Sequence, residues 1–373
     1  MRVAIDVRSL MEGRHSGVEE YTTQIIRALS LYAPGHTYHL FYSSYKPVQI
    51  PPFRENVVVH SFRYPNKVLH TSQLLFSRPR WDRMLPIIPD VVFIPNPHRT
   101  PVSHDLPLVS VVHDLGFERF PEFLTFRRRM SHQLLRNPQL LLQNSDHVIA
   151  VSQHTKEDVL RLYGVDPNRI SVVYSGLHTN SGMPTVVDIQ ALIRRHHLPE
   201  KFLLFIGTME PRKNIMSVVQ AFDAIAHGVP QHLVIAGEQG WKSHELHRAL
   251  AASAYRDRIH LIGFIPEEEK SALYAAADLF VYPSFYEGFG FPPLEALVAG
   301  TPVVTSFNSS LPEVVGKWAT LIDPYNTPQL AAVLQEYLLT PTRVPISVRK
   351  EIQETYSWER AAKQTISVLE GVV

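Results

Sequence analysis

The chain contains no cysteine among its 373 residues. This absence excludes disulfide bonds, cysteine-ligated zinc sites, iron–sulfur clusters and thiol nucleophiles. The chain also lacks any apolar run near the ~18 residues that a membrane-spanning helix needs. Its first ten residues resemble a strand entering a loop rather than a signal peptide, because Asp6 and Arg8 interrupt the apolar run. We therefore expect a cytoplasmic protein, either soluble or peripherally bound at the inner face of the plasma membrane.

Neither positive nor negative charge is in clear excess, because the formal net charge is only +1. Residues 1–175 hold 20 Lys and Arg against 15 Asp and Glu, whereas residues 176–373 hold 16 against 20. No basic stripe dominates, so we expect no nucleic-acid partner. A solvated surface is the default explanation of the basic first half. The alternative is an N-terminal half that faces an anionic membrane or a phosphorylated acceptor.

The length of the chain suits two domains rather than one. Short apolar runs alternate with helical patterns, which predicts parallel sheets that are covered on both faces. This alternation starts afresh at Phe202. We therefore predict an α/β protein with a Rossmann-like domain over residues 1–176, a connector over 177–199, a second Rossmann-like domain over 200–350 and a helical segment over 351–373.

Residues 279–305 carry the strongest local pattern. An apolar strand leads into a glycine-bearing loop, 287–290, and two prolines then open a helix. Backbone N–H groups at the start of such a helix form an anion site. Glu287 precedes the loop, and Glu295 is expected in the first turn of the helix. Anion donors beside carboxylates favour a ligand with both phosphates and hydroxyls, such as a nucleotide sugar.

The same residues resemble a known family of enzymes. Residues 287–296, EGFGFPPLEA, resemble the E-x7-E signature of the retaining GT-B glycosyltransferases of group 1, or family 4. Four further stretches are similar to the family's glycine loop, N-domain histidine, interdomain hinge and phosphate-binding segment: 16–21, 113–115, 173–177 and 207–214. The resemblance covers nearly the whole chain. It is greatest to bacterial mannosyl- and rhamnosyltransferases of cell-surface polysaccharide assembly, such as that of the O-antigen of lipopolysaccharide.

The resemblance implies a fold and a reaction. The fold is GT-B, with two Rossmann-like domains whose parallel sheets face across a cleft and a last helix that returns to the N-terminal domain. The C-terminal domain would bind the nucleotide sugar, and the N-terminal domain would bind the acceptor. The reaction is transfer of a hexosyl unit with retention of configuration, by front-face attack in which the departing phosphate takes the acceptor proton. The family implies neither a metal nor a cofactor.

The resemblance also implies a role for each candidate site residue. Glu287 would hold the hydroxyls of the donor sugar, and Glu295 the ribose diol. Arg212 and Lys213 would neutralise the departing diphosphate, and His113 would form a hydrogen bond to the donor sugar. Other donor-binding residues would offer backbone groups or room for the ligand: Gly17, Thr208, Gly263, Phe264, Gly288, Phe289, Gly290 and Phe291. Some relatives carry an arginine where this chain has Thr208, and Arg212 is expected to supply that charge.

Each of these residues also has a purely structural explanation. The two glutamates would serve as surface residues, and the basic pair as part of a solvated loop. His113 would be one structural histidine among 19. Residues 13–17 would be a tight turn, and residues 263–265 the end of a strand. The order of the five matching stretches favours the functional explanation.

GDP-mannose or GDP-rhamnose is the expected donor, and a glycan or lipid-linked glycan the expected acceptor. The alternatives are a transferase that uses UDP-glucose or UDP-N-acetylhexosamine, and a nucleotide-sugar-binding protein without activity. Residues 117–135 are predicted to be helical, at least in part. Arg127, Arg128 and Arg129 lie there among apolar residues, which is typical of a segment that binds an anionic membrane. An ordinary solvated helix is the alternative.

Overall fold

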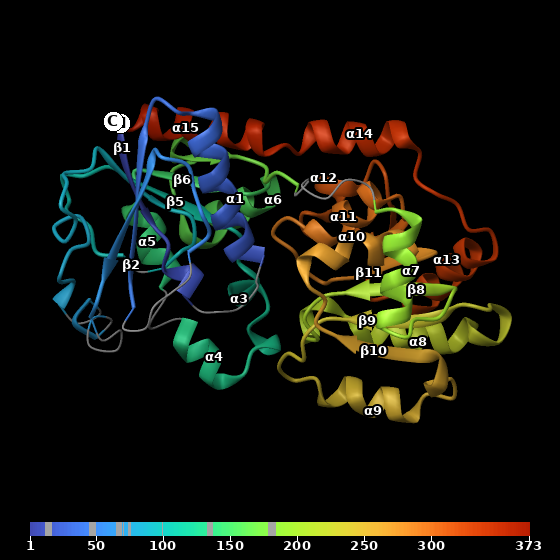
Figure 1. Ribbon diagram of the computed structural model, residues 1–373. Helices are drawn as coiled ribbons and strands as arrows, with labels where there is room; N and C mark the ends of the chain where they lie inside the picture. The colour runs from blue at the N-terminus through green and yellow to red at the C-terminus, as the bar shows by residue number, and fades with distance from the viewer. Residues whose placement is uncertain are drawn as a thin grey trace. The chain divides into compact units, whose positions relative to one another are not determined.

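The structure, a computed structural model, describes residues 1–11, 17–44, 50–64, 69, 71–73, 76–98, 100–132, 137–177 and 184–373. These residues form two compact units, which are composed as follows: Met1–Leu115, Phe126–Gly176 and Tyr356–Val373 in the first, and Gly116–Thr125 and Leu177–Thr355 in the second. Each unit is built on its own parallel sheet with helices around it (Figure 1). The predicted α/β fold of two Rossmann-like domains is therefore confirmed.

The first unit contains a seven-stranded sheet in the order β3-β2-β1-β4-β5-β6-β7. Its strands are β1 (Arg2–Asp6), β2 (Thr37–Ser43), β3 (Val57–Phe62), β4 (Val91–Ile94), β5 (Leu108–Val112), β6 (His147–Ala150) and β7 (Ile170–Val172). Every residue of β4 and β5 is buried, as expected of inner parallel strands that are covered on both faces. The edge strand β3 instead leaves Val58 and Val59 exposed.

The helices of the first unit connect these strands and include the end of the chain. They are η1 (Arg8–Met11), α1 (Gly17–Tyr32), α4 (Phe126–Ser131), α5 (Pro138–Asn144), α6 (Gln153–Tyr163), η4 (Pro167–Arg169) and α15 (Trp358–Gly371). α6 begins directly after Ser152, whose hydroxyl accepts a hydrogen bond from the N–H of Thr155.

The C-terminal helix α15 packs against α1 in the first unit, so the predicted return of the last helix to the N-terminal domain is confirmed (Figure 1). The rings of Tyr21 in α1 and Trp358 in α15 lie 5.6 Å apart. Gly176, the last residue before the chain enters the second unit, lies against the same tryptophan. A Cβ at Gly176 would be 2.4 Å from the backbone nitrogen of Trp358, so only glycine fits there.

The second unit contains a six-stranded sheet in the order β10-β9-β8-β11-β12-β13. Its strands are β8 (Phe202–Ile206), β9 (His232–Ala236), β10 (Ile259–Gly263), β11 (Leu279–Tyr282), β12 (Val303–Ser306) and β13 (Thr320–Ile322). Every residue of β8, β11 and β12 is buried. The register pairs Leu279 with Leu203 and Phe280 with Val303, so β11 lies between β8 and β12.

Helices surround this second sheet. They are α3 (Gly116–Arg119), η2 (Pro121–Phe123), α7 (Val186–Arg195), η5 (Pro211–Lys213), α8 (Ile215–Ile225), η6 (Ala226–Gly228), α9 (His244–Ala252), η7 (Arg256–Arg258), α10 (Glu267–Ala276), α11 (Phe291–Ala299), α12 (Leu311–Val315), α13 (Thr327–Leu339) and α14 (Ile346–Thr355). In the described part of the chain, no helix is long and apolar enough to cross a bilayer.

Residues 117–135 are helical in part, as predicted. The helical parts are three short pieces, α3, η2 and α4, and residues 133–136 lie outside the described part. Pro121 ends the first piece because it has no N–H to continue the helix. Residues 116–125 also belong to the second unit, although the sequence assigned them to the N-terminal domain.

Candidate donor site

The strand order of the second sheet predicts the edge of the sheet at which a ligand binds. The order reverses between β8 and β11, and the carboxyl ends of neighbouring strands at such a reversal leave a crevice for ligands. Residues 207–214 follow β8, and residues 283–290 follow β11. The two segments with the strongest family resemblance therefore meet at the reversal point of one sheet.

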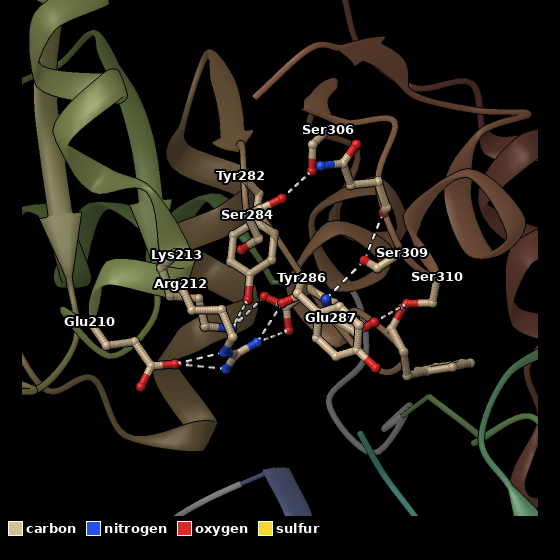
Figure 2. A network of polar contacts seen from close by, with 12 residues as sticks. Glu210, Arg212, Lys213, Tyr282, Ser284, Tyr286, Glu287, Ser306, Ser309 and Ser310 are labelled. Carbon is tan, nitrogen blue, oxygen red and sulfur yellow. Dashed lines mark hydrogen bonds and ion pairs between the residues drawn. The ribbon is translucent and has the colours of Figure 1, made fainter. Parts of the chain in front are cut away.

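Glu287 lies at the centre of this edge, and both predicted cations contact its carboxylate (Figure 2). Its Oε1 is 2.7 Å from Nζ of Lys213, and its Oε2 is 3.0 Å from Nη1 of Arg212. The glutamate is only 7% exposed. The structure thus brings three of the four predicted catalytic residues together in one buried ion-pair cluster.

Two further side chains orient the cations. Nη2 of Arg212 is 2.7 Å from Oε1 of Glu210, which is itself buried, and Nη1 donates to the carbonyl oxygen of Tyr286 at 2.7 Å. Nζ of Lys213 donates to the hydroxyl of Tyr282, the last residue of β11. Glu210 therefore orients the guanidinium of Arg212, and Tyr282 orients the ammonium of Lys213.

The charges of this cluster hold Glu287 ionised. Burial alone would raise the pKa of its carboxyl, but the positive charges of Arg212 and Lys213 outweigh burial and lower that pKa to about 2. Burial and the neighbouring Arg212 lower the pKa of Lys213, whereas Glu287 opposes that shift. Glu287 is thus an acceptor of hydrogen bonds at any neutral pH.

The loop 287–290 is anchored by two serines that precede α12. The N–H of Glu287 donates to Oγ of Ser309 at 2.8 Å, and Oγ of Ser310 donates to the carbonyl oxygens of Glu287 and Phe289 at 3.0 Å each. Gly290 precedes α11 with φ +100°, and a Cβ there would lie 2.8 Å from Leu311 Cδ2. The loop therefore needs glycine at 290 for two independent reasons.

Asn214 ties the segment after β8 to the segment after β11. Its φ of 55° ends η5 and lets α8 begin at the next residue. Its Nδ2 donates to the carbonyl oxygens of Pro283 at 3.1 Å and Pro324 at 2.8 Å. Ser217 in turn donates to Oδ1 of Asn214 at 2.7 Å, which fixes the amide orientation. These hydrogen bonds fix the position of Lys213 relative to the loop 287–290.

Glu295 lies further into α11 than the sequence predicted. α11 begins at Phe291, so Glu295 is its fifth residue and lies in the second turn rather than the first. Its Oε2 accepts a hydrogen bond from the hydroxyl of Tyr274 in α10 at 2.8 Å. Burial and the neighbouring Glu295 raise the pKa of that tyrosine well above its ordinary value, so the hydroxyl stays a donor.

Glycines follow three neighbouring strands at the same edge. Gly207 follows β8, Gly237 follows β9 and Gly263 is the last residue of β10, with φ of +157°, +135° and +72°. A Cβ at Gly237 would lie only 2.1 Å from the carbonyl oxygen of Gly207. Thr208 and Phe264, both predicted to bind the donor, lie exposed immediately after two of these glycines.

The remaining predicted site residues belong to the first unit. His113 follows β5 and is half-buried, and its Nε2 lies 2.7 Å from the carbonyl oxygen of Pro95. A carbonyl only accepts, so Nε2 carries the proton and Nδ1 is the acceptor of this ring. Burial lowers the pKa of His113, which favours the neutral ring. Gly17 is the exposed first residue of α1, and Gly13 lies outside the described residues.

Several residues of the site were missed by the sequence reasoning. Glu210 gave a signal, because a glutamate two residues before Arg212 at a strand end can orient it. Tyr282 gave no signal, since a tyrosine at the end of a buried strand cannot be distinguished from a core residue by its sequence pattern. Ser309 and Ser310 were missed because they are distant in sequence from the loop that they anchor. Among the described residues, no group of three or more His, Asp or Glu side chains gathers as metal ligands would.

Comparisons with known proteins agree with this geometry. The family model for glycosyl transferases group 1 matches residues 189–357, and the model for glycosyltransferase family 4 matches residues 15–181. The chain is 30% identical over 269 residues to O-antigen chain mannosyltransferase B of Escherichia coli, which covers 69% of each chain. Two Rossmann-like domains, the ion-pair cluster at a strand end and these matches define a glycosyltransferase. The chain belongs to the group 1 family of glycosyltransferases.

Two further likenesses extend the comparison. The chain is 29% identical over 263 residues to the MMP alpha-(1->4)-mannosyltransferase of Mycolicibacterium hassiacum, covering 68% of this chain and 58% of that one. The solved structure of sucrose-phosphate synthase from Thermosynechococcus elongatus superimposes with a TM-score of 0.76 and 19% identity, covering 100% of this chain and 98% of that one. This last likeness concerns the fold alone.

Proposed function

We propose that the protein is a retaining mannosyltransferase that moves mannose from GDP-mannose, or a related GDP-sugar such as GDP-rhamnose, to a sugar hydroxyl. The acceptor is a glycan or a lipid-linked oligosaccharide of surface polysaccharide assembly. The observation that carries the proposal is the buried carboxylate of Glu287, which Arg212 and Lys213 hold ionised at the ligand edge of the second sheet. The mannosyltransferase relatives support the choice of sugar.

Glu287 is suited to hold the donor sugar because its carboxylate can accept two hydroxyl hydrogen bonds. Its place in the cluster also keeps the two cations at the same edge as the sugar. The loop 287–290 adds backbone N–H groups at the start of α11, where the β-phosphate of the donor would bind. Glu295, held by Tyr274, is the proposed contact for the ribose diol.

Arg212 and Lys213 supply the electrostatic part of the mechanism. When the bond between the sugar and the diphosphate breaks, negative charge grows on the leaving phosphate. Two cations that are already oriented by Glu210 and Tyr282 stabilise that charge without reorganising, which typically contributes several kcal/mol. The phosphate oxygen then takes the proton of the attacking hydroxyl on the same face, so configuration is retained.

His113 is the proposed contact from the first unit. Its neutral ring uses Nε2–H on the carbonyl of Pro95, which leaves Nδ1 to accept a hydrogen bond from a hydroxyl of the donor sugar. The ring also lies edge-on to Tyr21 in α1, with centroids 4.7 Å apart, which fixes its orientation. We assign it a binding role and not that of a general base.

A panel of donors tests the proposal against its alternatives. GDP-mannose, GDP-rhamnose, UDP-glucose and UDP-N-acetylglucosamine are compared by thermal shift and by nucleotide release from the purified chain. We expect GDP-mannose to stabilise the chain most and to release GDP. Stronger stabilisation by a UDP-sugar would show that this sugar nucleotide, and not GDP-mannose, is the donor. Binding without nucleotide release in the presence of oligosaccharide acceptors would indicate a non-catalytic binding protein.

We also propose that the segment around α4 binds the inner, anionic face of the membrane. Phe126 is 80% exposed and Met130 is 39% exposed, and both lie within one helical turn of Arg127 and Arg129. Apolar side chains beside arginines suit an interfacial helix. Replacement of Arg127, Arg128 and Arg129 by glutamate should weaken binding to vesicles that contain anionic lipid. Binding equal to that of wild type would refute this proposal.

A further inference from the structure

Residues 116–125 leave the first unit between β5 and α4 and pack as part of the second. We call these ten residues the strap. α3 and η2 form most of it; Phe120 lies between the two pieces, and Pro121 is the first residue of η2. His113 lies three residues before the strap, and Phe126 directly follows it. The strap is therefore covalently continuous with the first unit at both ends, although its contacts belong to the second.

The strap is fixed on one side to the loop that follows β9. Nε1 of Trp241 donates to the carbonyl oxygen of Phe123 at 2.8 Å, and Nζ of Lys242 donates to the carbonyl oxygen of Glu122 at 2.5 Å. Both donors lie between Gly237 and α9, at the carboxyl end of the sheet. These bonds satisfy two backbone acceptors of η2 and so hold its backbone in place.

On its other side the strap packs on the loop that follows β11. The ring of Phe120 lies 5.8 Å from the ring of Tyr286, and the ring of Phe123 lies 5.6 Å from that of Phe285. Phe120 and Phe123 also stack on each other at 5.2 Å. β8 lies between β9 and β11 in the sheet, so the strap joins the loops on either side of the one that carries Arg212 and Lys213.

The residues that the strap contacts lead directly to the donor site. The N–H of Phe285 donates to the carbonyl oxygen of Arg212 at 2.9 Å, and the carbonyl oxygen of Tyr286 accepts from Nη1 of Arg212 at 2.7 Å. Glu287 is the next residue. A shift of the two aromatic rings would therefore move the acceptor that orients Arg212 and the backbone that carries Glu287.

We propose that Phe120 and Phe123 are positioning residues for the transfer reaction, which act through Phe285 and Tyr286 on Glu287 and Arg212. The proposal rests on the function assigned above to the Glu287 site. Neither phenylalanine is assigned a contact with the donor. Their role is to keep the carboxylate and the guanidinium at the positions that the transition state needs, where a displacement of about 1 Å can cost up to ~100-fold in rate.

The first measurement needs no ligand. Hydrogen–deuterium exchange of the full chain compares wild type with Phe120→Ala/Phe123→Ala and with Trp241→Phe, which keeps an aromatic ring but removes the bond to Phe123. Exchange over residues 285–290 should be about tenfold faster in the double variant, because two aromatic contacts are lost. Exchange in the first unit should be unchanged. Unchanged exchange over 285–290 would overturn the proposal, whatever the donor is.

The second measurement separates positioning from a loss of fold. In GDP-mannose turnover, the double variant should lose about tenfold to a hundredfold in kcat. Its KM for GDP-mannose should stay within about threefold, because Glu210 and Tyr282 still hold the cations. The single variant Phe123→Tyr keeps both aromatic rings and should have the wild-type kcat. Phe76→Ala, at an exposed phenylalanine of the first unit, is the matched control and should also have the wild-type kcat.

The outcomes of the two measurements are distinct. A wild-type kcat in the double variant would overturn the positioning role. A global rise in exchange, with kcat and binding lost together, would show that the strap only supports the fold and would also overturn it. If wild type does not turn over GDP-mannose, the proposed donor is wrong, and the exchange over residues 285–290 alone decides on the strap.

Discussion

Replacement of Glu287 by glutamine removes one charge from the buried cluster and leaves its shape nearly unchanged. In the wild-type chain, both oxygens of this carboxylate are paired, with Lys213 at 2.7 Å and Arg212 at 3.0 Å. A glutamine keeps one acceptor oxygen but presents an amide N–H₂ where the second oxygen was. One cation would therefore meet a donor instead of an acceptor, in a site that solvent barely reaches.

The pKa of Glu287 gives the size of this effect. The fall from its ordinary 4.5 to about 2 corresponds to about 3 kcal/mol in favour of the folded state. Arg212 retains Glu210 and Lys213 retains Tyr282, so neither cation is left without a partner. We therefore expect Glu287→Gln to destabilise the second unit by about 2 kcal/mol at pH 7. The transfer rate should fall by about 100-fold or more, because the sugar loses its anionic acceptor.

The sign of the pH dependence follows from the lowered pKa. The folded state holds Glu287 ionised more strongly than the unfolded state does, so the stabilisation is complete above the unfolded pKa of 4.5. It is lost as the pH falls through the window from about 5 to about 2, with roughly 2 kcal/mol gone by about pH 3. Glu287→Gln has no such group, so its disadvantage should shrink as the pH falls from 7 to 3.

Thermal unfolding at pH 7 and at the lowest pH where wild type still folds measures this difference, and nucleotide release measures the rate. A loss of about 2 kcal/mol in a domain of this size lowers the midpoint by about 4–8 °C. Glu200→Gln, at an exposed glutamate of the same unit, is the matched control and should change neither quantity. A Glu287→Gln chain with wild-type turnover, or with the same stability gap at both pH values, would refute the reasoning.

Three further predictions concern the same edge of the sheet. Gly237→Ala should destabilise the second unit by about 3 kcal/mol or more, seen as a lower thermal midpoint, because its Cβ would lie 2.1 Å from the oxygen of Gly207; an unchanged midpoint contradicts the close approach. Glu295→Gln should raise KM for the nucleotide sugar by about tenfold and change kcat little, since the ribose diol does not react; a loss confined to kcat would contradict that role. Turnover should persist within about twofold in excess EDTA if Arg212 and Lys213 balance the leaving charge as proposed, and a loss that Mg²⁺ restores would show that these cations are insufficient.

Much of the fold was predictable because parallel strands and amphipathic helices leave strong patterns. The apolar runs at Val91–Ile94, Leu108–Val112 and Leu279–Tyr282 are fully buried strands, as short apolar runs in a parallel sheet covered on both faces should be. β13 was missed because Thr320–Ile322 is only three residues long, too short for a pattern to show. The break at Pro121 was visible in the sequence, since proline cannot continue a helix, but the prediction for residues 117–135 gave no bounds for the separate pieces.

The site was predictable only in its local parts. Glu287, Arg212 and Lys213 follow strand ends, so topology alone brings them to one edge. The contacts between them depend on Tyr282 and Glu210, whose roles come from packing that no spacing encodes. The strap was assigned to the wrong unit because rings that meet across a long sequence separation, such as Phe123 and Phe285, leave no periodic signal.

The measurement that tests the central claim most directly is transfer of mannose from GDP-mannose by the purified chain, followed by NMR of the anomeric proton of the product. With a mannose-terminated oligosaccharide as acceptor, we predict a new mannosyl linkage with the anomeric configuration of the donor, formed by wild type and nearly abolished in Glu287→Gln. A product of inverted configuration, or equal transfer by the two chains, would contradict the account.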